Sequence, residues 1–368
     1  MKTLTVDLGD RSYPIMVGEG LLDAAGRRLA RLGFNSPPVV ISNSAVFRLH
    51  GERLLRSLRR QFGPSPVILI GDGERFKNHA TLLRIYNGLF RCRADRRSWI
   101  LALGGGVVGD IAGFAAASYM RGIPYASIPT TLLAQVDSSI GGKVGINVPQ
   151  GKNLIGAFHQ PSAVLSDTST LRTMPPREIA SGMFEVVKAG AIRSEPLLAY
   201  LEKRLDACLA CRASALGHIV VECSRIKAEV VSGDETEEEL RMVLNYGHTV
   251  GHALEAATRY RWFRHGEAVG WGMIAAVGYG RELGLLSGVE AARLVALTHS
   301  VTRLPSLEGI GIGGVWSALA RDKKFRDGRI RMVLLSRLGE TVLRSDIDPV
   351  HLKGFLRRFL QRRGVLQF

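Results

Sequence analysis

The second half of the chain holds a cluster of residues of metal-binding type. Three of the nine histidines, His248, His252 and His265, fall within eighteen residues, and the first two share one face of a predicted helix. Glu185 and Lys188 are three residues apart in GMFEVVKAG and also share a helix face. Two or three histidines with one carboxylate are what an open catalytic zinc site requires. The HTVGH motif lacks the glutamate of H-E-x-x-H, so the zinc protease motif is excluded.

A glycine-rich segment in the first half has the pattern of a phosphate cradle. Trp99–Leu103 is an apolar run of the length of a buried strand, and residues 104–109, GGGVVG, satisfy G-x-G-x-x-G. Small residues between Asp110 and Met120 predict a helix that lies close to a sheet. Exposed backbone N–H groups at such a helix start bind anions. No acidic residue follows at the distance that would bind a ribose hydroxyl, so a tight turn with close packing stays open as the alternative.

The next forty residues are rich in loops and hydrogen-bonding groups, which indicates a second anionic ligand beside the first. These groups are Thr130, Thr131, Asp137, Ser138, Ser139, Lys143, Asn147, Lys152 and Asn153. Further cations lie downstream, in CSRIKAEVV at Lys227, in Asp322-Lys323-Lys324, and at Arg241. Arg241 precedes His248 by seven residues, which on one helix places both on the same side. The alternative for Lys227 and the lysine pair is an ordinary solvated charge.

Alternating strand and helix patterns organise residues 1–175. Short apolar strands are predicted at 4–8, 13–17, 38–41, 66–70 and 99–103, and helices at 21–32 and 53–62. This alternation favours a doubly wound parallel sheet. The loop GDGERFKN at 71–78 precedes a helix that ends near Leu89, where Glu74 and Lys77 either cap the helix or contact a nucleotide across the strand ends.

The periodicity changes to mostly helical beyond Glu178, and Pro175-Pro176 break the chain just before it. A strand pair at 330–335 and 340–344 and a basic helix at 349–363 end the sequence. The prediction is therefore an α/β domain with a Rossmann-like doubly wound parallel sheet at 1–175. A mainly α-helical domain that binds metal and substrate is expected at 176–368.

Net charge, hydropathy and cysteine content limit the classes of protein to which the chain can belong. The 368 residues carry 49 Lys and Arg against 33 Asp and Glu, a net charge of +16, but no nucleic-acid-binding motif accompanies them. An anionic small-molecule substrate explains the charge without nucleic acid. The start resembles no signal peptide and no apolar run spans a bilayer, so we expect a cytoplasmic protein that binds no membrane. The four cysteines form no disulfide framework, and Cys208-x-x-Cys211 has no second pair to complete a zinc site.

Motifs along nearly the whole chain resemble the 3-dehydroquinate synthase family of sugar-phosphate cyclases. They are GGGVVGD at 104–110, YMRG at 119–122, PTTLLAQVDSSIGGK at 129–143, GKNLIGAF at 151–158, GMFEVVKAG at 182–190, LNYGHTVGHALE at 244–255, HGEAV at 265–269 and DKK at 322–324.

The resemblance implies a carbon–oxygen lyase of the shikimate pathway to aromatic amino acids. Such an enzyme converts 3-deoxy-D-arabino-heptulosonate 7-phosphate to 3-dehydroquinate and phosphate. The steps are transient oxidation by NAD, β-elimination of phosphate, reduction and intramolecular aldol closure. The implied cofactors are NAD and Zn²⁺ or Co²⁺, and the implied assembly is a homodimer, to which Arg121 contributes from a neighbouring subunit.

The resemblance also assigns roles to individual residues. The metal ligands would be Glu185, His248 and His265. The NAD contacts would be Asn43, Glu74, Lys77, Gly104, Gly105, Gly106, Val107, Asp110, Thr130, Thr131, Lys143, Lys152 and Thr173. The substrate phosphate would be bound by Arg121, Lys143, Asn153, His252 and one of Lys323 and Lys324. The substrate carboxylate would be bound by Lys227 and Arg241, and its hydroxyls by Asp137, Lys188 and Asn245, with Lys152 lining the site.

Two departures and three rival functions accompany this resemblance. Ala189 stands where an aromatic residue or His is common, and Met183-Phe184 replaces a frequent Leu-Ala. The rivals are a cyclase that makes a valiolone-type product, a metal-dependent alcohol dehydrogenase of related fold, and a basic nucleic-acid-binding protein without catalysis. A substrate lacking a carboxylate has no use for Lys227 and Arg241, which favours the keto acid phosphate.

Overall fold

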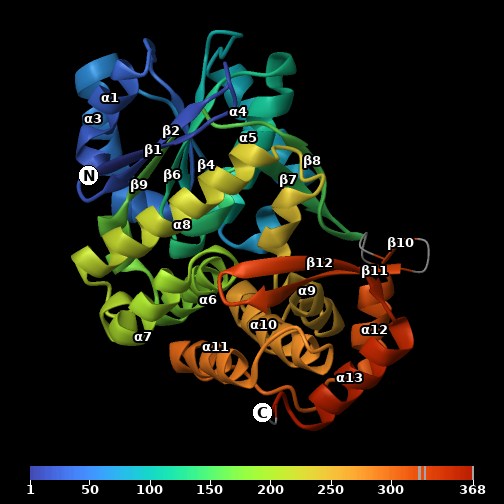
Figure 1. The fold of residues 1–368 in the computed structure, drawn as a ribbon. Helices are drawn as coiled ribbons and strands as arrows, with labels where there is room; N and C mark the ends of the chain where they lie inside the picture. The colour runs from blue at the N-terminus through green and yellow to red at the C-terminus, as the bar shows by residue number, and fades with distance from the viewer. Residues whose placement is uncertain (322–324, 327–328, 367–368) are drawn as a thin grey trace. The chain divides into compact units, whose positions relative to one another are not determined.

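The computed structural model describes residues 1–321, 325–326 and 329–366, which form two compact units (Figure 1). The first unit consists of Met1–Pro175 and Cys211–Glu235, and the second of Pro176–Ala210 and Thr236–Phe368. The prediction placed one break near residue 175 and kept all later residues together. In the structure, residues 211–235 instead group with the first unit.

The first unit is built around a seven-stranded sheet in the order β1-β2-β9-β6-β5-β3-β4. All neighbouring strands are parallel except the β1–β2 pair. Its strands are β1 (Lys2–Val6), β2 (Tyr13–Gly18), β3 (Val39–Asn43), β4 (Val67–Ile70), β5 (Ile100–Gly104), β6 (Tyr125–Pro129) and β9 (Ala163–Asp167). Its helices are α1 (Leu21–Arg31), α2 (Ser44–Val46), α3 (Glu52–Phe62), α4 (His79–Arg91), α5 (Gly106–Ser118) and α8 (Ala213–Gly233).

Alternate residues of the central strands face opposite sides of the sheet, which creates two apolar cores. Ile41 and Ala102 pack with residues of α4 and α5, whereas Val40 and Leu101 pack with residues of α1 and α3. Strands buried on both faces are characteristic of doubly wound sheets. This arrangement confirms the predicted α/β class, and it explains why β3 and β5 read as continuous apolar runs.

The strand order reverses at β3, because the chain passes from β3 outward to β4 and then returns to β5 on the other side. Ligands of open α/β sheets bind outside the carboxyl ends of the strands at such a switch point. Asn43 ends β3 and Gly104 ends β5, so both predicted contacts of a nucleotide lie at this edge.

The segment predicted as rich in loops contains more strand than expected. Besides β6 it forms an antiparallel hairpin of β7 (Lys143–Val148) and β8 (Gly151–Phe158). All eight residues of β8 are partly or largely exposed, so the strand has no buried face that would require the apolar alternation by which a strand is recognised.

The second unit is mainly helical, as predicted. Its helices are α6 (Pro176–Arg193), α7 (Glu195–Leu209), α9 (His248–Ala257), α10 (His265–Glu282), α11 (Gly288–Val301), α12 (Ile312–Arg321) and α13 (Pro349–Gln361). Strands β10 (Phe325–Arg326), β11 (Arg329–Arg337) and β12 (Glu340–Ile347) form a three-stranded sheet, which confirms the predicted strand pair. Within the described ranges, no helix has the length and apolar character needed to cross a bilayer.

Candidate functional site

The glycine turn of the first unit leaves no room for side chains. A Cβ at Gly104 would lie 2.6 Å from the Val108 side chain, and one at Gly105 would lie 2.9 Å from that of Thr131. A Cβ at Gly106, the first residue of α5, would lie 3.0 Å from the Ser138 hydroxyl. The turn therefore presents bare backbone at the start of a thirteen-residue helix, which is the arrangement that binds phosphate groups.

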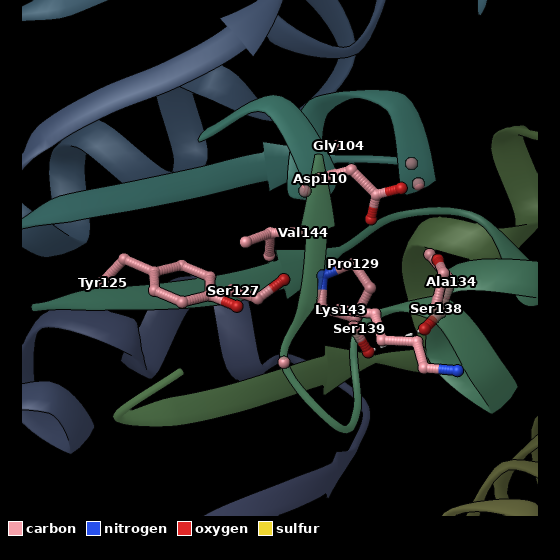
Figure 2. Close-up of a pocket in the computed structure, with 14 residues that line it drawn as sticks. Gly104, Asp110, Tyr125, Ser127, Pro129, Ala134, Ser138, Ser139, Lys143 and Val144 are labelled. Carbon is pink, nitrogen blue, oxygen red and sulfur yellow. Dashed lines mark hydrogen bonds between the residues drawn. The ribbon is translucent and has the colours of Figure 1, made fainter. Parts of the chain in front are cut away.

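A pocket opens beside this turn. Figure 2 shows Asp110, Ser138 and Lys143 around it. The buried hydroxyls of Thr130 and Ser138 have no hydrogen-bond partner among the described residues. Since buried polar groups are nearly always hydrogen-bonded, a polar ligand is the expected partner. The cradle and these hydroxyls fit a phosphate-containing nucleotide.

Lys77 connects the loop before α4 to the start of α5. Its buried ammonium group forms an ion pair with Asp110 and donates a hydrogen bond to the side-chain oxygen of Asn153. Burial raises the pKa of Asp110, and the charge of Lys77 opposes that rise. Asn78, rather than Glu74 or Lys77, caps α4, because its Oδ1 accepts a hydrogen bond of 3.0 Å from the amide of Thr81. The helix-cap alternative for Glu74 and Lys77 is therefore wrong.

Glu185, His248 and His265 come together in the second unit. Oε1 of Glu185 lies 3.6 Å from Nε2 of each of the two histidines. Neighbouring ligands of a tetrahedral zinc ion with bonds of about 2.0–2.1 Å are about 3.3 Å apart, close to these distances. That oxygen is buried and has no hydrogen-bond partner within the described chain. Lys188, one turn along α6, forms an ion pair with the other carboxylate oxygen. This donor set fits a divalent metal ion.

His252 belongs to the same cluster. The ligand atoms of His248, His252 and His265 all lie within 4.8 Å of one another. The ring centroid of His252 is 5.2 Å from that of His248 and 5.8 Å from that of His265. His252 is exposed whereas His248 is buried. An exposed imidazole beside two less exposed ones is suited to contact a bound small molecule at the edge of the metal-binding cluster.

Neighbouring groups orient the two imidazoles. Nδ1–H of His248 donates to the carbonyl of Tyr246 at 3.1 Å, which leaves Nε2 toward Glu185. Nδ1–H of His265 donates to the buried carboxylate of Glu255 at 3.3 Å. A second partner of this kind fixes the tautomer of a metal-binding histidine. No sequence motif assigned a role to Glu255, although its position seven residues after His248 on a helix could have indicated it.

Close contact between α9 and α10 sets the positions of these histidines. A Cβ at Gly272 in α10 would lie 1.8 Å from the carbonyl oxygen of Gly247, which immediately precedes α9. A Cβ at Gly251 in α9 would lie 2.9 Å from the carbonyl oxygen of Ala268. The two backbones therefore touch, and the approach depends on glycine at these positions.

Two family models cover most of the chain. The model for the N-terminal part of 3-dehydroquinate synthase matches residues 67–181, and the model for its C-terminal part matches residues 182–325. The chain belongs to the 3-dehydroquinate synthase family. A curated 3-dehydroquinate synthase from Pelotomaculum thermopropionicum is 48% identical over 362 residues, which are 98% of this chain and 96% of that protein.

Solved structures of sugar-phosphate cyclases share the fold of this family member. The 2-epi-5-epi-valiolone synthase of Streptomyces hygroscopicus with bound NAD⁺ and Zn²⁺ is 28% identical, with a TM-score of 0.88 over 97% of this chain and 99% of that one. A 2-deoxy-scyllo-inosose synthase complexed with carbaglucose-6-phosphate, NAD⁺ and Co²⁺ is 26% identical, with a TM-score of 0.87 over 98% and 100%.

Several residues that the 3-dehydroquinate synthase motifs assign to substrate make polar contacts in the structure. In the first unit, the ammonium group of Lys227 donates to Oδ1 of Asp137 at 2.6 Å. In the second unit, Nδ2 of Asn245 donates to Oε1 of Glu237 at 2.8 Å. Lys143 lines the pocket described above, and Lys152 is the second residue of β8. Lys323 and Lys324 lie outside the described residues.

Arg241 does not lie on the helix that carries His248. It belongs to a short 3₁₀ segment, Leu240–Asn245, and the chain then turns through Gly247 at φ 77° before α9 begins. The expectation of one shared helix face is therefore wrong. Arg241 is nevertheless 2% exposed, which is unusual for a guanidinium group and makes it more than a solvated charge.

The remaining residues that the motifs assign to the nucleotide lie in the first unit, and some already have protein partners. Asn43 accepts from the amide of Val46 and donates to Asp72. The hydroxyl of Thr173 donates to the carbonyl of Thr170, and that of Thr131 accepts from the amide of Ala134. Val107 lies in the first turn of α5. Their contacts with a nucleotide stay predictions.

Proposed function

We propose that this chain is a 3-dehydroquinate synthase. It converts 3-deoxy-D-arabino-heptulosonate 7-phosphate to 3-dehydroquinate and inorganic phosphate in the shikimate pathway. The observation that carries the proposal is the 48% identity to a curated enzyme of this activity over 98% of the chain. The cluster of Glu185, His248 and His265 supports it, because a metal-dependent reaction needs an open donor set of this kind.

We infer that NAD binds at the glycine turn of the first unit and that Zn²⁺ or Co²⁺ binds at the cluster of the second. When bound, the nucleotide accepts and returns a hydride, and the divalent ion makes a substrate hydroxyl more acidic. Glu185 and the imidazoles of His248 and His265 would hold the ion. The amides at Gly105 and Gly106, the hydroxyls of Thr130 and Ser138, and Lys77 would hold the nucleotide.

The basic residues bind and orient the two anionic ends of the substrate in this proposal. The resemblance assigns Lys143, Asn153 and His252 to the phosphate and Lys227 and Arg241 to the carboxylate, with Lys152 lining the site. The substrate hydroxyls form hydrogen bonds with Asp137, Lys188 and Asn245. Holding both ends fixed lets elimination, reduction and aldol closure follow from one bound geometry, since positioning alone lowers such barriers by several kcal/mol, up to about 7–11.

We also propose a homodimer to which Arg121 contributes from a neighbouring subunit. Arg121 is exposed and has φ 69°, between Met120 at φ 50° and Gly122 at φ 117°. Two consecutive non-glycine residues in the left-handed region are unusual and point to a functional constraint on this turn. Light scattering of the purified protein tests the assembly, and a monomeric mass at assay concentration would contradict it.

The reaction assay that tests the function measures phosphate release from the seven-carbon keto acid phosphate. We expect continuous release that a chelator abolishes and that added Zn²⁺ or Co²⁺ restores. NADH absorbance should show no net increase, because the hydride returns to carbon in each cycle. Steady formation of NADH would instead indicate a dehydrogenase, and turnover of sedoheptulose 7-phosphate without turnover of the keto acid phosphate would indicate a valiolone-type cyclase.

Replacing Gly106 with valine is expected to weaken NAD binding by more than about tenfold. The new side chain would meet the Ser138 hydroxyl and cover the amides that face the phosphate groups. Titration of the protein with NAD⁺ by calorimetry measures the loss. Gly217→Ala in α8 is the matched control, since a Cβ there meets no atom within 4 Å. Unchanged NAD affinity in the Gly106 variant would place the nucleotide elsewhere.

A further inference from the structure

The β7–β8 hairpin contains a bulge that includes Asn153, which the resemblance assigns to the substrate phosphate, and Lys152, which it places in the lining of the site. Ile146 pairs with Ile155 and Val148 pairs with Gly151, so the single residue Asn147 lies opposite residues 152–154. Asn153 within this bulge has φ 54°. Bulges redirect side chains and occur next to active sites. Something must hold the Lys152–Asn153 bulge in this conformation, because a non-glycine residue in the left-handed region is disfavoured.

Asn147 holds the bulge with its side-chain oxygen. Its Oδ1 accepts a hydrogen bond of 3.0 Å from the backbone amide of Asn153. Because a backbone amide can only donate, this contact fixes which end of the Asn147 amide is oxygen. The Nδ2 group therefore faces the other way.

The other groups of Asn147 bind the loop that precedes α4. Nδ2 donates a hydrogen bond of 2.7 Å to Oε1 of Glu74, and the backbone N–H donates one of 2.8 Å to the carbonyl of Lys77. The Lys77 ammonium group in turn binds Asp110 at the start of α5 and Oδ1 of Asn153. One residue thus contacts both the Glu74–Lys77 loop and the Lys152–Asn153 bulge, and Lys77 completes the connection.

We propose that Asn147 is a positioning residue that couples nucleotide binding at the Glu74–Lys77 loop to phosphate binding at the Lys152–Asn153 bulge. The inference rests on the proposed function, which places NAD at this loop and the substrate phosphate at this bulge. A nucleotide that orders the loop also orders the bulge through Asn147, so the anion binds more tightly. Such coupling is reciprocal, and each ligand raises the affinity for the other by the same factor.

The test measures the affinity for inorganic phosphate with and without saturating NAD⁺, by calorimetry on the full-length protein. The ratio of the two affinities is the coupling factor. We expect a factor of about five or more in the wild-type protein, the lower end of typical couplings, and a factor near one in Asn147→Ala. A wild-type factor of one, or an unchanged factor in Asn147→Ala, overturns the proposal.

Two further variants, Asn147→Asp and the double variant with Glu74→Gln, distinguish a positioning role of Asn147 from a general loss of structure. Asn147→Asp keeps the acceptor for Asn153 but turns a carboxylate toward Glu74, so the coupling factor should fall. Adding Glu74→Gln supplies an amide donor to that carboxylate, and the double variant should recover most of the coupling. No recovery in the double variant, compared with Asn147→Asp, overturns the proposal.

Asn78→Ala is the matched control from the same loop. The Asn78 side chain caps α4 and donates to the carbonyl of Arg75, so these two hydrogen bonds lie within the loop and the first turn of α4. The Asn78→Ala variant should have the same coupling factor as the wild type. A fall in the coupling factor as large as that in Asn147→Ala would show that any loosening of the loop is sufficient, which contradicts a specific role for Asn147. Failure of the proposed function is recognised separately, because the wild-type protein would then release no phosphate from the keto acid phosphate.

Discussion

The His265→Ala variant is expected to lose metal and turnover together while the fold stays intact. Nε2 of His265 lies 3.6 Å from Oε1 of Glu185, and its side chain is 30% exposed, so its removal leaves a small opening at the surface rather than a cavity in the core. Loss of a residue that only orients a ligand costs about 10–100-fold in metal affinity, and loss of a ligand should cost more than that. Competition with a chromophoric chelator measures the affinity, and phosphate release measures turnover.

His252→Ala tests whether the ligand set is the one proposed. The ligand atoms of all three histidines lie within 4.8 Å of one another, and Oε1 of Glu185 lies 3.6 Å from Nε2 of both His248 and His265. We expect the His252 variant to keep its metal and to lose activity. Circular dichroism of both variants should match that of the wild type. Normal metal content and turnover in the His265 variant would refute the assignment.

The parts of the fold that the sequence predicts best are those where burial follows the chain periodicity. Residues 100–104 are buried throughout, and a Cβ at Gly104 or Gly105 would clash with a neighbouring side chain, so an apolar run and a glycine turn locate both the strand and the cradle. The His248–His252 pair lies on α9 as its spacing requires. In each case the physical constraint acts between residues that are neighbours in the sequence.

The parts that the sequence does not predict depend on contacts between distant segments. Helix α8 follows the first helices of the second unit in the chain, yet it packs against β1 and β2 (Figure 1). The helix that precedes it in the chain, α7, belongs to the second unit and does not indicate this packing. A hydrogen bond of 2.8 Å from the amide of Asp7 to the hydroxyl of Ser232 joins segments more than two hundred residues apart. No local periodicity encodes such a contact.

The candidate site divides in the same way. Residue types and spacing indicate a cluster of His248, His252 and His265 with one carboxylate, because metal chemistry restricts which side chains serve. The choice of Glu185, His248 and His265 as the ligands comes from the family resemblance. The groups that orient these side chains cannot be predicted in the same way, since every residue type has a backbone carbonyl such as that of Tyr246. Asn147 is similar: it was one of many polar residues in a loop-rich segment, and only the bulge opposite it gives it a distinct place.

Replacing Gly272 with alanine is expected to destabilise the second unit by about 3 kcal/mol, the upper end of the usual cost of overpacking, and to weaken metal binding as well. The new methyl group would lie 1.8 Å from the carbonyl oxygen of Gly247 and 2.8 Å from the amide nitrogen of Gly251. Both are backbone atoms, which cannot move aside as a flexible side chain can. Helix α10 must therefore shift away from α9, and His248 and His265 begin those two helices.

Gly280→Ala, two turns further along α10, distinguishes this contact from a general effect of alanine in the helix. A Cβ at Gly280 meets no atom within 4 Å. Because alanine is favoured over glycine inside a helix, this variant should be more stable than the wild type by about 0.5–1 kcal/mol and should bind metal normally. Urea denaturation of the metal-free proteins measures stability, and chelator competition measures affinity. Equal behaviour of the two variants would mean that contact between the helix backbones does not set the positions of the two histidines.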